Sequence, residues 1–323
     1  MRLSSLQITP VMGFMLLVMS SAASAQAGTD RSIDEILEPI QLTDRVYYFY
    51  GSIEGRAPIN LGMNNNVGFV VTDAGVVMID SGPGYKVAGM IAEAVASVTD
   101  QPITHVINLG SQDHRWLGNG WFFEQGAEIV ALQRTAETQA RYGTSHMSRS
   151  IRTLGEETMA GTEPVTAPAP VDADHHQVEI GGVAFELIYV ADAHFPGDIM
   201  LYLPGEDVVF TGDYVYTERL LGIQPESNPV GKLENFRKLE ELNPGIVVPG
   251  HGAATDMATA RRDAGDYLEV VIREVQAGID EWETLDETVE RIADLPQFQH
   301  LLHYDAWHRA NVNRTYLFLE ANP

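Results

Sequence analysis

Five aspartate and histidine residues are the side chains of this sequence best suited to hold a metal ion. They are Asp113, His114, His194, Asp213 and His251, and each lies next to the end of a predicted strand. Imidazole nitrogens and carboxylate oxygens are ligands of catalytic zinc, which keeps one coordination position open for water. The chain has no cysteine, so thiolate ligands are excluded and both zinc and iron suit the ligand types. The residue types therefore predict metal-dependent chemistry.

Two series of strands and helices must position these side chains. In the first series, runs of β-branched and aromatic residues predict strands, and apolar residues at helical spacing after residue 84 predict a helix. The first-series strands are expected at residues 46–50, 67–71, 76–80, 103–109 and 127–132. The second-series strands are expected at residues 177–180, 183–190, 199–203, 208–211 and 245–249, with a helix at 230–242.

Two similar β/α halves predict an α/β (α+β) fold, an αββα sandwich with its site at the strand ends. We assign residues 45–256 to this domain and residues 26–44 to an N-terminal segment, of which residues 26–40 are expected to be loose. Residues 257–323 are expected to form a helical C-terminal extension packed on the core, because no linker separates them from it. Helices are predicted there at 261–276, 285–293 and 307–320.

The order of these motifs resembles the metal-binding loops of the metallo-β-lactamase superfamily. The motifs are Asn64-Asn65-Asn66, Asp80-Ser81-Gly82, Asp113-His114, Gly118-Asn119, His194, Gly212-Asp213 and Gly250-His251-Gly252. The resemblance covers roughly residues 45–320 and implies a metallohydrolase fold. The family's first loop reads His-x-His-x-Asp-His, whereas this chain has Leu109 and Ser111 at the two leading histidine positions.

The resemblance also implies which residues bind metal. Asp113, His114 and His251 would form the family's second metal site, Asp213 would match the bridging aspartate, and His194 would belong to the first site. Leucine cannot ligate and serine is a weak ligand, so the first site loses two of its three histidines. We therefore expect one metal ion, zinc or alternatively iron, held by Asp113, His114, Asp213 and His251.

The first functional hypothesis is a mononuclear metallohydrolase acting on a small molecule. The metal would lower the pKa of bound water and generate a hydroxide, which attacks an ester, lactone, thioester or amide-type substrate. Asp113 would hold the metal, Asp213 would be a fourth ligand or orient the water, and His194 could act as an acid or base. The aromatic side chains beside these ligands could line a pocket or pack in the core: Trp116, Phe195 and Tyr214.

The alternative is a non-catalytic metal- or ligand-binding accessory protein of a periplasmic redox system, and a third class is a redox enzyme with one iron. The loss of two ligands favours the accessory protein, whereas the presence of His194 and Asp213 counts against it. The run from His308 to Tyr316 resembles the C-terminal signature of exported family members linked to sulfur-oxidation or quinoprotein systems. For His308 we favour packing of the tail on the core. His146, His175 and His176 are expected in exposed loops.

The N-terminus and the charge indicate where the protein works. Residues 1–25 contain Arg2, a short apolar run and an Ala23-Ser24-Ala25 cleavage motif, which predict a signal peptide. We therefore expect a periplasmic or secreted protein with no membrane span after cleavage. With 20 basic and 45 acidic residues, the net charge is −25. Such a surface repels nucleic acid and anionic lipid, and the sequence identifies no protein partner.

Overall fold

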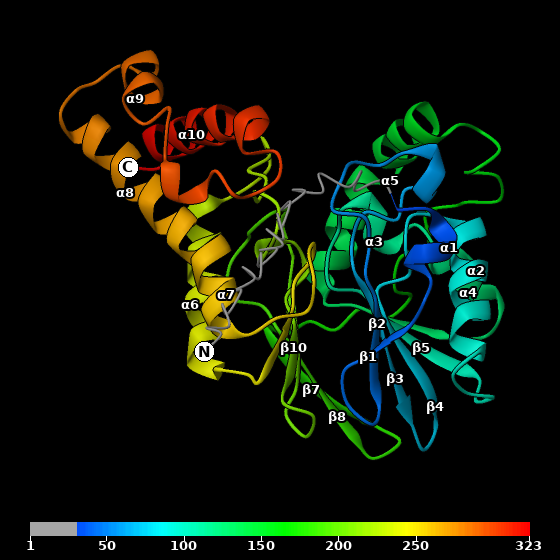
Figure 1. Cartoon of the computed structure of the whole chain (residues 1–323). Helices are drawn as coiled ribbons and strands as arrows, with labels where there is room; N and C mark the ends of the chain where they lie inside the picture. Colours follow the sequence, from blue (N-terminus) through cyan, green and yellow to red (C-terminus); the bar gives the residue numbers. More distant parts are fainter. Residues whose placement is uncertain (1–30) are drawn as a thin grey trace, which may run out of the picture.

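The computed structural model describes residues 31–323 and arranges them around two β-sheets (Figure 1). The first sheet has six strands in the order β1-β2-β3-β4-β5-β6. Its strands are β1 (Ile40–Gln41), β2 (Val46–Phe49), β3 (Val67–Thr72), β4 (Gly75–Ile79), β5 (Ile103–Ile107) and β6 (Glu128–Val130). Neighbours from β1 to β4 are antiparallel, whereas β4, β5 and β6 run parallel. The parallel part therefore places the carboxyl ends of β4 and β5 at one edge.

The second sheet has five strands in the order β11-β10-β9-β8-β7. Its strands are β7 (His175–Ile180), β8 (Val183–Ile188), β9 (Met200–Leu203), β10 (Val208–Phe210) and β11 (Ile246–Val248). Only the β10–β11 pair of this sheet is parallel. The loops after β10 and β11 consequently emerge together, and these are the loops that carry Asp213 and His251.

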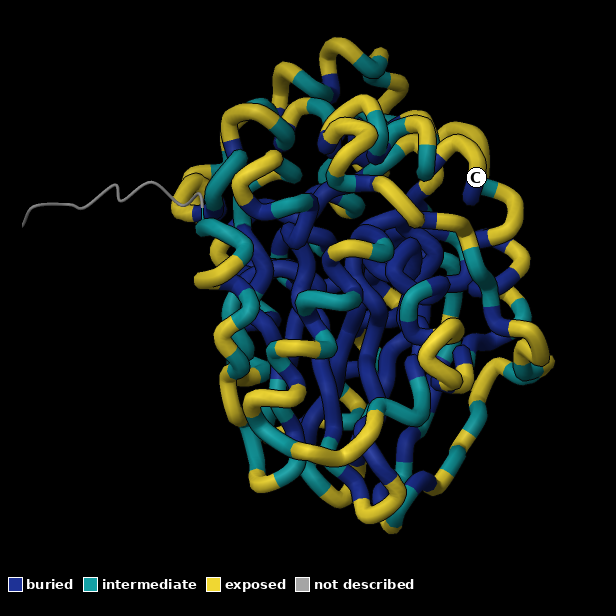
Figure 2. The backbone as a smooth tube through the Cα atoms, turned by 90° about the vertical axis from the view of Figure 1, so that its right-hand side faces the viewer, coloured by how far each residue is buried: buried dark blue, intermediate teal, exposed yellow. Residues whose placement is uncertain are grey.

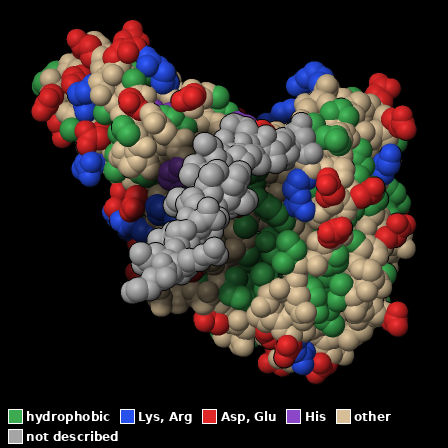
Figure 3. Space-filling model, viewed as in Figure 1, with side chains coloured by type: hydrophobic (Ala, Val, Ile, Leu, Met, Phe, Trp, Pro, Cys, Tyr) green, Lys and Arg blue, Asp and Glu red, His purple; other side chains and the backbone are tan. Residues whose placement is uncertain are grey.

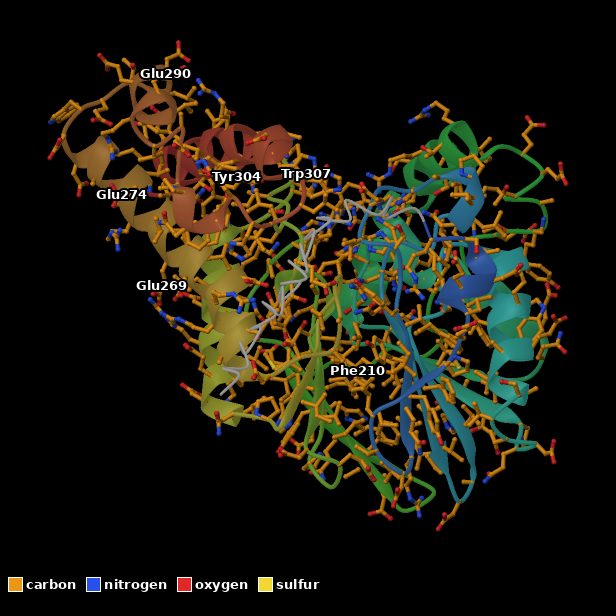
Figure 4. All side chains as sticks on the ribbon, in the orientation of Figure 1. Phe210, Glu269, Glu274, Glu290, Tyr304 and Trp307 are labelled. Atoms are coloured by element: carbon orange, nitrogen blue, oxygen red, sulfur yellow. The ribbon has the colours of Figure 1, made fainter. Side chains whose placement is uncertain are left out.

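The two sheets pack face to face through an apolar core, which Figure 2 shows as buried strands at the centre of the molecule. Val70 and Val77 of the first sheet and Leu201 and Phe210 of the second are all buried in this core. Phe210, labelled in Figure 4, lies between the sheets. A Cβ atom on Gly68 would lie 2.4 Å from the Phe210 ring. The missing side chain of Gly68 therefore makes room for this aromatic ring.

Helices cover the outer face of each sheet, which confirms the αββα sandwich. On the first sheet, α2 and α4 bury apolar side chains such as Ile91 and Phe122. On the second, α6 and α8 contribute Phe236 and Val271 to a separate core. The helices up to β11 are α1 (Ile33–Ile36), η1 (Pro58–Asn60), α2 (Tyr85–Ala96), α3 (Asp113–Trp116), α4 (Asn119–Glu124), α5 (Gln133–Leu154), η2 (Gly212–Tyr214) and α6 (Pro229–Leu242).

The C-terminal residues form helices at the upper left of Figure 1, close to the predicted positions. They are α7 (Met257–Ala260), a π-helical turn η3 (Arg261–Gly265), α8 (Asp266–Asp280), α9 (Leu285–Arg291), η4 (Pro296–Phe298) and α10 (Tyr304–Ala321). His308 of α10 is buried, with Nε2 2.7 Å from the Ile292 carbonyl oxygen and Nδ1 3.0 Å from the Tyr267 hydroxyl. This agrees with the expected packing role of His308.

Several local expectations were wrong. His146 is buried in α5, because its ring packs against Tyr142 and Phe195. His175 and His176 belong to β7, where pairing with β8 overrides the polar composition of the segment. Parts of the segment predicted to be loose form α1 and β1.

Two expectations about the membrane concern different parts of the chain. The predicted signal peptide, residues 1–25, lies outside the described residues. Within residues 31–323, no helix is both long and apolar enough to cross a bilayer.

Candidate metal centre

The predicted ligands approach one another because they follow strands whose carboxyl ends share an edge. Asp113 and His114 begin α3 after β5, Asp213 lies in η2 directly after β10, and His251 follows β11. The side-chain amide of Asn66, at the start of β3, donates to the carbonyls of Pro249 and Gly252. The first sheet thus holds the His251 loop of the second sheet in place.

Three of the predicted ligands form a buried cluster. The Asp213 carboxylate lies between two imidazoles, with Oδ2 3.1 Å from His114 Nε2 and Oδ1 3.2 Å from His251 Nε2. All three side chains are buried. Among residues 31–323, this is the one group of three or more histidine, aspartate or glutamate side chains that could hold a metal ion.

The hydrogen bonds of His251 leave a lone pair directed at Asp213. His251 Nδ1 lies in short contact with the Asn64 carbonyl oxygen, which can only accept, and 3.3 Å from Arg219 Nη1, which can only donate. Because the carbonyl oxygen is the nearer partner, we assign the proton to Nδ1. Burial first, and then Arg219, lower the pKa of His251 to about 3, so the ring is neutral at neutral pH. Nε2 and the Asp213 oxygen are then two acceptors 3.2 Å apart. Such a pair fits a bound cation between or beside them.

His114 has the opposite arrangement. Arg56 Nη2 lies 2.8 Å from His114 Nδ1, and a guanidinium can only donate, so Nδ1 is the acceptor. The remaining proton is therefore on Nε2, which donates to Asp213. His114 can bind a metal through Nε2 only after its tautomer changes and Arg56 leaves Nδ1.

Asp213 is fixed by a buried arginine from the other half of the sandwich. Arg115 donates from Nε to Asp213 Oδ2 at 3.0 Å and from Nη2 to Oδ1 at 2.6 Å, and its Nη1 binds Asp80 at the end of β4. Burial would raise the pKa of Asp213, but Arg115 outweighs it and holds the pKa well below its usual range. Asp80 also accepts from the Leu109 backbone N–H at 2.8 Å, which is the loop-ordering role expected from the sequence.

Asp113, the fourth predicted ligand, does not join the cluster in this structure. Its carboxylate accepts from Arg56 Nη1 at 2.6 Å and from Arg149 Nε at 3.0 Å. Burial would raise its pKa, but Arg56 chiefly holds the pKa well below the ordinary value. Asp113 is thus an ionised carboxylate between two guanidinium groups, and its role as a ligand stays a prediction.

The family's first metal site is not assembled around His194. Leu109 is buried in the core between the sheets, and the Ser111 hydroxyl donates to the Pro196 carbonyl. His194 Nε2 lies 3.0 Å from Gln112 Oε1. Burial first, and then Lys232, hold the pKa of His194 well below its usual value, so this imidazole is neutral.

His114, His194 and His251 line a pocket of about 320 Å³, together with arginine residues that the sequence analysis did not predict. The lining residues are Gly55, Arg56, Asn64, Gln112, His114, Arg149, Thr153, His194, Tyr216, Arg219, Gly222, Gln224, His251 and Trp307. The three arginines fall outside every ligand motif, so the sequence offered no signal for them. Trp116, Phe195 and Tyr214 do not line the pocket and are buried, as expected for core packing.

The C-terminal extension completes one wall of this pocket. Asn311 of α10 donates to the Leu221 carbonyl at 2.8 Å and accepts from the Ile223 N–H at 2.9 Å. These bonds anchor the loop that carries Arg219. Trp307, at the end of α10 nearest the sandwich in Figure 4, stacks on the Arg219 guanidinium, whose carbon lies 4.7 Å from the centre of the indole ring system.

The fold and this loop arrangement define a class of protein. Residues 113–251 match the family model described as the metallo-beta-lactamase superfamily, so this segment of the chain belongs to that superfamily. Among curated proteins, the chain is 29% identical over 181 residues to the 2,4-dinitroanisole O-demethylase subunit alpha of Nocardioides sp. (strain JS1661). The match covers 55% of this chain and 50% of that relative, so the chain spans about half of its length.

Solved structures share the fold at low sequence identity. A metallo-beta-lactamase from Pontibacter korlensis superposes with a TM-score of 0.59 at 18% identity, covering 72% of this chain and 98% of that one. The stereoselective inverting sec-alkylsulfatase Pisa1 from Pseudomonas sp. gives 0.70 at 14% identity, covering 86% of this chain and 49% of that one. These likenesses establish the fold, while the chemistry must be argued from the side chains of this chain.

Proposed function

We propose that this chain is a mononuclear metal-dependent hydrolase that acts on a small molecule. The observation that carries the proposal is the buried pair of acceptors formed by His251 Nε2 and Asp213 Oδ1. His251 and Asp213 would hold the ion, zinc or alternatively iron, and His114 would join them after its tautomer change. Asp113 would become a further ligand only by giving up an arginine partner. A bound divalent ion supplies Lewis acidity that activates water for attack on an ester, lactone, thioester or amide-type bond.

The protein side chains have separate tasks in this proposal. Arg115 orients the Asp213 carboxylate by binding both of its oxygens. The Asn64 carbonyl fixes the tautomer of His251, as second partners of metal-bound histidines commonly do. His194 lines the same pocket and is the candidate acid or base of the reaction.

Metal content per chain is the first test, measured by elemental mass spectrometry on wild type and on His251→Ala. We expect about one zinc per wild-type chain and loss of both metal and hydrolysis in the variant, because His251 supplies the free lone pair. His175→Gln is the control, since His175 is exposed on β7. Unchanged activity in His251→Ala would contradict the proposal. One iron per chain would favour a redox enzyme instead.

The second candidate is a non-catalytic accessory protein of a redox system. The arginine contacts of Asp113 and His114 favour it, because both side chains bind the Arg56 guanidinium group. Turnover distinguishes the candidates, using a panel of esters, lactones, thioesters, β-lactams and sulfate esters. The panel includes an aryl methyl ether and a secondary alkyl sulfate because the O-demethylase and sec-alkylsulfatase names suggest such substrates. Absence of metal after reconstitution, together with no turnover, would favour the accessory protein.

We propose that the protein is periplasmic or secreted, on the strength of its N-terminal sequence. The expected result is that cell fractionation recovers a mature chain beginning at Gln26, after cleavage behind Ala25. N-terminal sequencing of the recovered protein measures this directly. A full-length chain retained in the cytoplasm would contradict export.

A further inference from the structure

The Arg56 side chain binds two of the predicted metal ligands at once. Its Nη1 donates to Asp113 Oδ2 at 2.6 Å, and its Nη2 lies 2.8 Å from His114 Nδ1 and in short contact with Asp113 Oδ1. The Asp113 and His114 side chains are buried, and that of Arg56 is 13% exposed. Forked, charge-assisted bonds of this kind are among the strong hydrogen bonds of proteins. One guanidinium group therefore holds both ligands that follow β5.

These bonds hold both residues in a state that a metal ion would have to change. At His114, the acceptor role of Nδ1 places the ring proton on Nε2, the nitrogen that faces Asp213. At Asp113, both carboxylate oxygens accept from Arg56. A metal ion would need the lone pair of His114 Nε2 and an oxygen of Asp113. Arg56 and a metal ion are thus alternative cations for the same two side chains.

The surroundings of Arg56 allow its side chain to move. Arg149 Nε donates to the same Asp113 carboxylate at 3.0 Å, so the buried charge keeps a partner when Arg56 withdraws. Arg56 lines the pocket of about 320 Å³, which gives the guanidinium group space on its other side. The preceding residue, Gly55, is exposed, and nothing lies within 4 Å of a Cβ atom built there. No neighbour at this position therefore opposes a small shift of the segment.

We propose that Arg56 is an internal competitor of the metal ion, which occupies Asp113 and His114 and must swing into the pocket before they can coordinate. The competition lowers the zinc affinity of the centre and makes the ligand set depend on the position of one side chain. The inference deepens the proposed function and rests on it in taking Asp213 and His251 as the first residues to hold the ion. Arg56 is a positioning residue, because it acts through the ligands.

Zinc affinity measures this competition without requiring turnover. The dissociation constant of zinc is determined on the mature chain at neutral pH, by competition with a chromophoric chelator. Arg56→Gln should bind zinc about tenfold or more tightly than wild type, because the ion no longer displaces charge-assisted bonds. Arg273→Gln is the matched control and should equal wild type, since the Arg273 side chain is 67% exposed and does not line this pocket. Unchanged or weaker zinc binding in Arg56→Gln would overturn the inference.

A second variant separates competition from simple charge repulsion. Arg56→Lys keeps the positive charge, but an ammonium group lacks the planar fork that binds Asp113 and His114 together. We expect Arg56→Lys to tighten zinc binding by about threefold or more. A gain in Arg56→Gln while Arg56→Lys equals wild type would show that only the charge matters, and would reject the competition. Arg56→Lys also decides the question by itself if Arg56→Gln fails to fold.

The tautomer of His114 provides a spectroscopic test in wild type. In the metal-free chain, nitrogen NMR of histidine-labelled protein should find the His114 proton on Nε2. Zinc binding should move that proton to Nδ1, because Arg56 leaves this nitrogen and Nε2 coordinates. A His114 proton that stays on Nε2 after zinc has bound would contradict the proposal.

The combined results distinguish this inference from the proposed function. Zinc binding and hydrolysis by wild type, with no gain of affinity in Arg56→Gln, would reject the competitor and leave the hydrolase. Zinc binding by Arg56→Gln but not by wild type would support the competitor and reject the hydrolase proposal for the natural chain. If wild type, Arg56→Gln and Arg56→Lys all fail to bind zinc, both proposals are wrong.

Discussion

At the scale of single residues, His146 links acidity to stability. Its ring is buried between Tyr142 and Phe195, and burial chiefly lowers its pKa from 6.5 to about 4. Above pH 6.5 the imidazole is neutral in both the folded and the unfolded chain. Between pH 6.5 and 4 the unfolded chain binds a proton that the folded chain does not bind, so stability falls as the pH falls.

The size of this effect follows from the pKa difference. Between pH 6.5 and pH 5, His146 should remove about 2 kcal/mol of unfolding free energy. We therefore expect His146→Leu to lose about 2 kcal/mol less than wild type when the pH falls from 7 to 5. Urea unfolding at both pH values measures the difference, with exposed His175→Gln as the control. Parallel losses in His146→Leu and wild type would reject this account.

The sequence predicted some site residues better than others, for a physical reason. Asp213 and His251 were predicted from the resemblance of their motifs to those of the family, and the parallel pairing of β10 and β11 in the structure brings the two loops together. The pocket's arginines come from three separate segments: Arg56 lies just before η1, Arg149 lies in α5, and Arg219 lies in the loop between η2 and α6. Their long side chains reach the pocket from these different positions. No periodicity or spacing encodes that meeting. The contacts of Asp113 with arginine were hidden for the same reason.

At the scale of elements, the packing of β3 against β10 depends on the absence of a side chain at Gly68. Gly68→Ala should destabilise the protein by about 1–3 kcal/mol, because its Cβ would lie 2.4 Å from the buried Phe210 ring. Denaturant unfolding of the variant measures the loss. Gly205→Ala is the matched control, since nothing lies within 4 Å of a Cβ at that glycine.

A second substitution identifies the cause of that loss. Phe210→Leu in the Gly68→Ala background should recover part of the stability relative to the sum of the two single changes, because a smaller side chain frees space between the sheets. Strict additivity of the two changes would show that the ring is not the obstacle. The strands themselves were predicted well, because each is an apolar run bounded by turns. The short elements α1 and β1 were missed because two to four residues carry too little pattern.

At the scale of the whole molecule, the distribution of charge differs between surface and interior. Acidic side chains are spread over the face shown in Figure 3, including the C-terminal helices at its upper left. The basic side chains of the pocket stand against that background. The C-terminal extension was predicted to pack on the core, but its contribution of Trp307 to the pocket could not be predicted, because it depends on tertiary packing.

The buried Asp80–Arg115–Asp213 chain has a consequence for how loss of function is understood in this protein. Asp80 follows a strand of one sheet and Asp213 follows a strand of the other, so the two buried ion pairs of Arg115 link the two sheets. Removing the Asp213 carboxylate would leave the buried Arg115 charge only partly compensated, which would lower the unfolding free energy by about 3–5 kcal/mol. Asp213 would therefore stabilise the fold even in a related chain without catalytic activity. Because Asp213 has this structural role, its presence alone does not indicate catalysis. His251 takes no part in the Asp80–Arg115–Asp213 ion pairs, so it is the more informative residue for catalytic activity.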